Sequence, residues 1–145
     1  MKKMINFYDT SSLILNTKHL FQNNEKFVIS SITLEELENI KTSKNKDHDI
    51  KIAVRQLLHT LDEHIGDYDV CLFKEAMLNP ILKEDLTVNN DMKILATAIF
   101  YNSIIPINFI TNDLALKTIA RLYFDDIYIN SIKEEPDEYI GYKTI

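Results

Sequence analysis

Glycine and proline are scarce in this sequence. Its 145 residues include only two glycines, Gly66 and Gly141, and three prolines. A loop that cradles phosphates needs several closely spaced glycines, because only backbone without a Cβ can approach the phosphate oxygens closely enough. The scarcity of glycine therefore excludes P-loop and dinucleotide-binding sites of the usual kind.

Cysteine is nearly absent, and long apolar runs are missing altogether. Cys71 is the only cysteine, so no disulfide can form within the chain, and a reducing compartment is expected. Segment 1–9 lacks the apolar stretch of a signal peptide. No run approaches the roughly 20 apolar residues that span a bilayer. We therefore expect a cytoplasmic protein with no membrane partner.

Basic residues are outnumbered by acidic ones, and the net charge is −6. Proteins that bind duplexes through phosphate contacts usually carry a basic surface, so the charge argues against simple duplex binding. It is compatible with an enzyme whose acids hold divalent cations, because a bound cation reverses the sign of the local charge.

The length of the chain favours a single domain, which we place at 1–132, followed by a tail or linker at 133–145.

Apolar segments predict five strands, at 5–8, 27–30, 70–73, 107–111 and 127–129. Helical patterns lie between them, at 11–20, 33–41, 50–65, from about 90 onward, and 114–122, and 80–88 is expected to be a loop. Strands that alternate with helices and are apolar on both faces predict an α/β fold. Its central parallel sheet would be covered by helices on both sides.

Several helix ends carry capping signals. Thr33 and Glu36 have the spacing of a capping box, with Thr33 as the N-cap. Asn89 or Asn90 can cap the helix that follows, and Gly66 is expected to end the long helix 50–65.

Four acids are predicted to meet at one edge of this sheet. Asp9 and Asp113 follow strands, while Glu36 and Asp91 lie at the start of helices. In a parallel sheet, sites form beyond the carboxyl ends of the strands. Clustered carboxylates are the ligands that Mg²⁺ or Mn²⁺ prefers, and two such ions can promote phosphodiester hydrolysis. Each acid alone could equally serve as a helix cap, so the hypothesis depends on all four sharing the edge.

Four segments resemble the motifs of the PIN-domain family of nucleases. They are Phe7–Leu13 with its Asp-Thr pair, Ile32–Leu37 with a Glu before Leu, Asn90–Ala98 with Asp-x-x-Ile-Leu-Ala-x-Ala, and Phe109–Asp113 with Thr-Asn-Asp. The resemblance runs from about Ile5 to Ile129. It implies a three-layer PIN-like fold of about five strands.

The resemblance also implies an activity and its residues. A PIN-like chain would be a metal-dependent endoribonuclease, a hydrolase that cleaves single-stranded RNA with Mg²⁺ or Mn²⁺ held by Asp9, Glu36, Asp91 and Asp113. The family pattern places the ligand directly before Leu37, which selects Glu36 over Glu35. Thr10, Ser11 and Asn112 are candidates for positioning a ligand or water, or are ordinary turn and cap residues.

Segment Glu35–Lys41 is similar to the PIN domain found N-terminal to PhoH-like ATPases. Alternatives stay open: a weakly active or non-cleaving RNA-binding module attached to such an ATPase, or the toxin ribonuclease of a toxin–antitoxin pair. The expected partners are single-stranded RNA, a PhoH-like ATPase domain in the same chain, and a second copy of the chain in a homodimer.

Four basic residues lie at the end of the second predicted helix, between it and the third, or within the third. They form either a solvated face or a guide for the RNA backbone: Lys41, Lys44, Lys46 and Arg55.

Two other classes begin with a strand and an aspartate. A haloacid-dehalogenase-type phosphatase needs a second Asp two residues later, where this chain has Ser11. A receiver domain needs an acidic pair after the first strand and a lysine directly after the last one, whereas Lys133 comes late. Both classes are therefore set aside.

Overall fold

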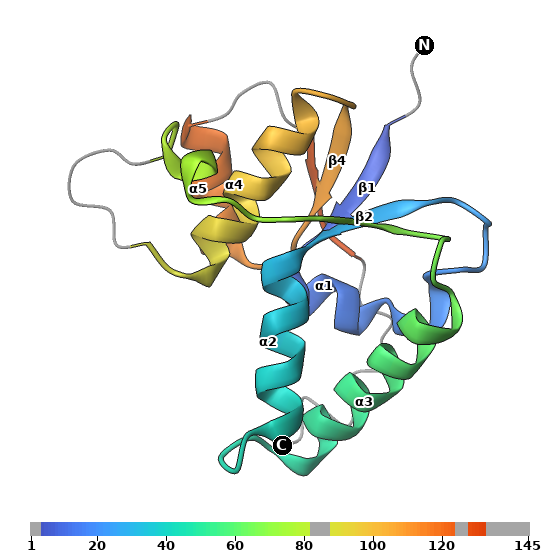
Figure 1. The fold of residues 1–145 in the computed structure, drawn as a ribbon. Coiled ribbons are helices and arrows are strands. Elements are labelled where there is room, and N and C mark those ends of the chain that lie inside the picture. Colours follow the sequence, from blue (N-terminus) through green and yellow to red (C-terminus); the bar gives the residue numbers. More distant parts are fainter. Residues whose placement is uncertain (1–3, 82–87, 124–127, 133–145) are drawn as a thin grey trace.

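The fold is a five-stranded parallel sheet between helices, as seen in a computed structural model that describes residues 4–81, 88–123 and 128–132 (Figure 1). The elements in chain order are β1 (Ile5–Tyr8), α1 (Thr10–Leu15), the 3₁₀ helix η1 (Thr17–His19), β2 (Phe27–Ser30), α2 (Ser31–Thr42), α3 (His48–Glu63), β3 (Asp69–Cys71), the 3₁₀ helix η2 (Glu75–Leu78), α4 (Asn90–Asn102), β4 (Ile107–Ile110), α5 (Leu114–Tyr123) and β5 (Tyr128–Asn130).

The strand order is β3-β2-β1-β4-β5, and every neighbouring pair is parallel. The predicted fold class is therefore confirmed. Strand β1 lies at the centre, with Tyr8 in register with Ile29 of β2 and Ile110 of β4. Because all strands point the same way, the residues that follow β1 and β4 emerge at one edge of the sheet, next to the start of α2.

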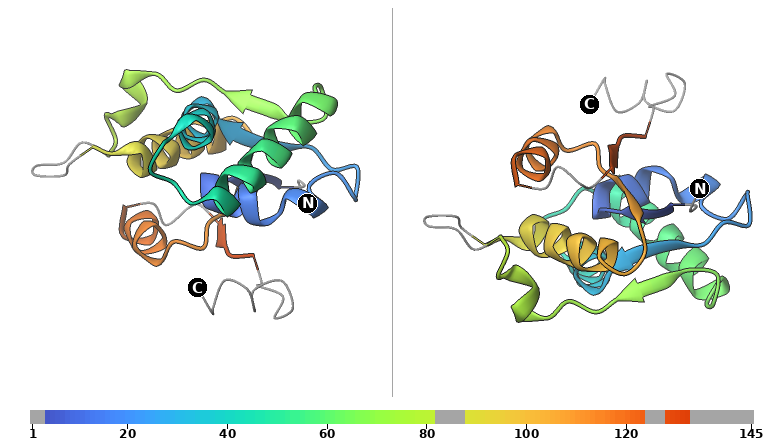
Figure 2. Two further views of the ribbon diagram at one scale, coloured as in Figure 1. Left: turned by 90° about the horizontal axis from the view of Figure 1, so that it is seen from below. Right: turned by 90° about the horizontal axis from the view of Figure 1, so that it is seen from above.

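Helices cover both faces of the sheet (Figures 1 and 2). Two apolar clusters hold them there, one on each face. Phe7 and Phe109 face the cluster that includes α4, and their rings lie 6.1 Å apart. Tyr8 and Ile110, the next residues along the same strands, face the cluster that includes α1 and α3. Side chains alternate between faces along a strand, so both faces of a central strand must be apolar.

The predicted helix 11–20 was too long. Helix α1 ends at Leu15, and η1 follows at Thr17–His19. The Thr17 hydroxyl donates to the carbonyl oxygen of Ile14 at 2.7 Å, and the Asn16 amide donates to two carbonyls at once. Such local hydrogen bonds compete with a regular helical ladder, which explains the early end.

The predicted capping box of Thr33 and Glu36 was wrong. Helix α2 begins at Ser31, and its N-cap is Ser30, whose Oγ accepts a hydrogen bond from the Ile32 amide at 3.1 Å. Strand β2 therefore runs directly into α2 without a loop. This connection frees Glu36 from a capping role.

The long helix α3 begins and ends two residues earlier than predicted. Asp47 caps its start by accepting from the Asp49 amide. Ile65, expected on the buried face, lies past the helix end and is 74% exposed. Gly66 does adopt a positive φ of 99°, but in the turn after the C-cap His64.

Strands β3 and β4 are shorter than predicted, and η2 was not predicted. Beyond Cys71, the Phe73 amide donates to the Ser31 hydroxyl at 2.9 Å, so a side chain replaces the sheet ladder there. Most of the predicted loop 80–88, residue 127 and the tail 133–145 lie outside the described residues.

Each helix in the described part of the chain is too short or too polar to span a bilayer.

Candidate functional site

Asp9 is a buried carboxylate at the centre of the sheet edge. It follows β1, its backbone amide donates to the Ile110 carbonyl at 3.1 Å, and the residue is only 3% exposed. Its Oδ1 accepts from the Ser12 amide at 2.9 Å and so caps α1. Its Oδ2 accepts from the Thr111 hydroxyl at 2.5 Å. These bonds hold the carboxylate in one orientation despite its burial.

Asp113 is tied to Asp9 through the same threonine. The Asp113 amide donates to Thr111 Oγ1 at 3.1 Å, and the Asp113 Oδ1 accepts from the Leu116 amide at 3.0 Å. Asp113 therefore caps the start of α5, which is the helix-cap role that the sequence allowed for each of the four acids. The Thr111 hydroxyl links the two strand-end acids, because it donates to one side chain and accepts from the backbone of the other.

Glu36 points toward the same edge from α2. The Thr10 hydroxyl donates to its Oε1 at 2.5 Å, across 26 residues of sequence. Glu36 is half-buried, whereas Glu35 is exposed. This difference is the one expected if Glu36, and not Glu35, faces the site.

Asp91 is in the first turn of α4 but does not cap it. The cap is Asn89, whose Oδ1 accepts from the Met92 amide at 2.9 Å. A carboxylate in a first turn is favoured by the helix dipole. Burial nevertheless raises the pKa of the Asp91 carboxyl above its ordinary value of 3.8. The remaining causes are the negative charges of three other carboxylates, those of Asp113, Glu36 and Asp9.

The four predicted acids therefore share one electrostatic environment. Their donor chemistry fits a hard divalent cation, because all four side chains offer carboxylate oxygens. In the described part of the chain, however, no group of three or more His, Cys, Asp or Glu side chains is arranged to hold a metal ion. Both Asp9 oxygens and one Asp113 oxygen already accept hydrogen bonds. The metal site at these residues stays a prediction.

The three supporting residues have different contacts. Thr10 orients Glu36, as described above. Ser11 is exposed, and its hydroxyl is 3.5 Å from Asp9 Oδ1, at the limit of a hydrogen bond. The amide of Asn112 exchanges hydrogen bonds with the backbone of Ile132, at 2.8 and 3.1 Å, which ties down the segment after β5.

Sequence reasoning missed two buried hydroxyls at this edge, those of Thr111 and Ser12. Ser12 Oγ lies 2.7 Å from the Ile110 carbonyl and 3.1 Å from the Asp9 carbonyl. The signal that could have identified Thr111 is its place at a strand end two residues before an acid. A hydroxyl there can accept from the backbone of the acid, in the manner of a helix cap.

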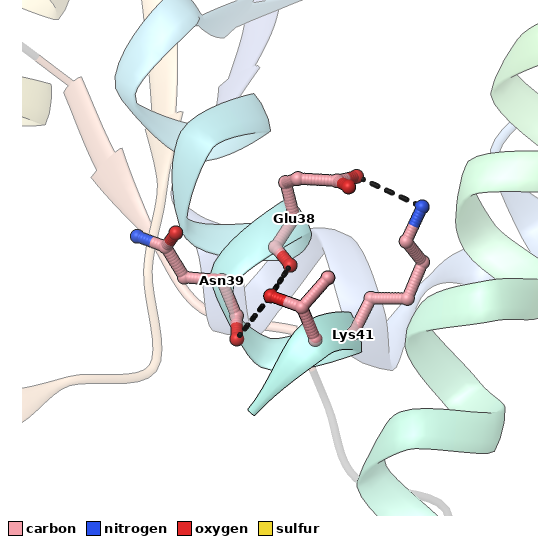
Figure 3. Close-up of polar contacts among 4 residues, drawn as sticks. Glu38, Asn39 and Lys41 are labelled. Carbon is pink, nitrogen blue, oxygen red and sulfur yellow. Dashed lines mark hydrogen bonds and ion pairs between the residues drawn. The ribbon is translucent and has the colours of Figure 1, made fainter. Parts of the chain in front are cut away.

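Three of the candidate RNA-binding residues, Lys41, Lys44 and Lys46, lie at or near the junction of α2 and α3, and Arg55 lies in the middle of α3. Figure 3 shows the Lys41 ammonium next to the carboxylate of Glu38, at 3.0 Å. Lys44, Lys46 and Arg55 are exposed. Glu36 precedes the end of α2 at Thr42 by about 9 Å along the helix axis, from the helical rise. Lys41, one residue before that end, is therefore about 7.5 Å from Glu36 along the same axis.

Comparison with known families gives one result. A family model described as PIN domain matches residues 7–123, most of the chain. A search of curated proteins found no match.

Proposed function

The chain belongs to the PIN-domain family, whose members are generally metal-dependent nucleases, and on that premise we propose that it hydrolyses phosphodiester bonds of single-stranded RNA. The proposed cofactor is Mg²⁺ or Mn²⁺. The observation that carries the proposal is the environment of Asp91, whose pKa is raised first by burial and then by the charges of the three other predicted acids. Carboxylates that repel one another in this way are suited to a divalent cation.

Asp9, Glu36, Asp91 and Asp113 would hold the cations. When bound there, divalent cations would activate water and would stabilise the charge on the attacking and leaving oxygens of an in-line displacement. The chain's own contribution is to fix the carboxylates. Thr111 links the two strand-end acids, and Thr10 orients the glutamate.

The proposed products follow from the nucleophile. Water attacks phosphorus in line with the 3′-oxygen, the P–O3′ bond breaks, and the 3′-oxygen takes up a proton. The products are then a 5′-phosphate and a 3′-hydroxyl, and the 2′-hydroxyl takes no part. Single strands are the proposed substrate because a flexible backbone can adapt to the acidic edge of the sheet more readily than a rigid duplex.

A second candidate is an RNA-binding module that cleaves weakly or not at all, including one attached to a PhoH-like ATPase. The observation that favours it is the absence, among the described side chains, of three carboxylates already arranged around one point. Both candidates would use the exposed Lys44, Lys46 and Arg55 to contact the RNA backbone.

Cleavage of end-labelled single-stranded RNA tests the proposal. Wild-type protein should cleave with Mn²⁺ or Mg²⁺ and lose activity in excess chelator. Asp9→Asn should reduce the rate by at least about 100-fold, because it removes one negative ligand. Asparagine keeps an oxygen that can accept from the Ser12 amide, so the fold should survive, as circular dichroism would verify.

Three outcomes would count against the nuclease. Cyclic 2′,3′-phosphate ends would overturn the water mechanism. Cleavage that persists in Asp9→Asn would point to a contaminant. Binding of RNA without cleavage under all metal conditions would favour the non-cleaving module.

A further inference from the structure

Helices α2 and α4, which carry Glu36 and Asp91, are connected by a buried pair of hydroxyl groups. Ser30 and Thr97 are both 0% exposed, and their Oγ atoms lie 3.1 Å apart although 67 residues separate them in the sequence. We propose that this pair positions Glu36 and Asp91 relative to each other for divalent-cation binding. The inference rests on the proposed function.

The direction of each hydrogen bond in this link can be assigned. Thr97 Oγ1 lies 2.7 Å from the Lys93 carbonyl, which can only accept, so the Thr97 proton is used there. The Ser30 hydroxyl must then donate to Thr97 Oγ1. Ser30 Oγ in turn accepts from the Ile32 amide at 3.1 Å. The result is a continuous chain from the Ile32 amide through both hydroxyls to the Lys93 carbonyl, with every proton used once.

Both ends of this chain lie in helix turns next to the candidate ligands. Ile32 is in the first turn of α2, four residues before Glu36. Lys93 is in the first turn of α4, two residues after Asp91. A displacement of one first turn relative to the other would therefore be transmitted directly to the spacing of the two acids.

The surroundings of the pair explain why hydrogen bonds, and not packing, would set this spacing. The neighbouring cluster between α2 and α4 is apolar and includes Ile32, Ile94 and Ala98. Apolar contact is non-directional and tolerates sliding. A hydrogen bond restricts both distance and angle, and a buried hydroxyl without a partner is unfavourable. The hydroxyl pair therefore fixes one alignment of the two helices.

Thr97→Val tests the role, because valine keeps the shape and removes the hydroxyl. We expect calorimetric titration with Mn²⁺ alone to show an affinity about 10-fold weaker than wild type, the lower range for residues behind metal ligands. Thr97→Ser should restore it. The matched control is Thr60→Val in α3, which also loses a hydrogen bond to a carbonyl four residues earlier but, among the described residues, makes no side-chain hydrogen bond to a second element. It should bind Mn²⁺ within about 2-fold of wild type.

A control for general destabilisation is Val54→Ala, a cavity variant in the other core cluster. Weaker Mn²⁺ binding in Thr97→Val than in Val54→Ala, at comparable melting temperatures, supports positioning. Equal weakening in the two variants, or wild-type affinity in a folded Thr97→Val, overturns it.

The proposal can also be judged if wild-type protein binds no Mn²⁺ and cleaves no RNA, in which case the proposed function itself fails. Crystal structures of wild type and Thr97→Val then decide whether the link sets the spacing. A change in the separation between the Cα atoms of Glu36 and Asp91 supports the structural part of the proposal, and an unchanged separation overturns it.

Discussion

At the scale of single residues, Thr111 shows how one hydroxyl can organise two charged groups. It donates to Asp9 Oδ2 and accepts from the Asp113 amide, and it is fully buried. Like charges held at fixed positions are unfavourable for an isolated folded chain. The hydrogen bonds offset part of that cost and keep the carboxylates in place. The repulsion that remains is the kind of strain expected of functional sites.

Asp91 is the residue where the cost of burying a carboxylate, together with this repulsion, can be measured. Its folded pKa is raised, so the ionised form destabilises the folded state. That penalty develops as pH rises above the ordinary value of 3.8 and is complete above the raised folded pKa. Asp91→Asn should therefore raise the melting temperature in chelator at neutral pH, by roughly 2–4 °C. The gain should shrink as pH falls toward and below the ordinary value.

The opposite result has a definite meaning. Asn at this position gives up the favourable interaction of a first-turn carboxylate with the helix dipole, about 0.3–1 kcal/mol. A lower melting temperature at neutral pH would show that this interaction exceeds the combined cost of burial and repulsion, and Asp91 would then be a structural residue.

At the scale of elements, α2 decides which of two adjacent glutamates faces the acids. Glu35 and Glu36 differ by about 100° around the helix, so only one can point to the sheet edge. We predict that Glu36→Gln lowers cleavage and Mn²⁺ affinity by at least about 10-fold, and that Glu35→Gln leaves both within about 2-fold. Parallel titration and cleavage assays measure this. Equal losses in both variants would contradict the assignment.

The elements also show how far sequence reasoning reached. Long periodic segments and buried strands were predictable because their patterns reflect burial on one or two faces. Helix starts were harder to predict. Ser30 and Thr33 both offer a hydroxyl, and only the direct connection of β2 to α2 makes Ser30 the cap. The shared edge of Asp9 and Asp113 followed from the parallel topology. The hydroxyl partner of Thr97 could not be predicted from that topology, because its pairing with Ser30 depends on how α4 packs on β2.

At the scale of the whole molecule, cation binding should couple to global stability. A ligand that binds only the folded state stabilises it by about 2.7 kcal/mol at 100 times its dissociation constant. For a chain of this length we expect saturating Mn²⁺ to raise the wild-type melting temperature by about 5–10 °C. The combined variant Asp9→Asn/Asp113→Asn should show no such rise in scanning calorimetry. A rise of equal size in that variant would place the cation elsewhere.

The central position of β1 has a last consequence, for the order in which the protein is made. Asp9 follows the first strand of this sheet to be synthesised, yet its partner Thr111 follows it by 102 residues, and Ser12 binds the Ile110 carbonyl across 98. A nascent chain therefore carries Asp9 while about 100 further residues are added, before β4 can pair beside β1. The complete acidic edge can exist only after Asp113 has left the ribosome, so a nuclease built on this topology would be inactive until that point of its synthesis.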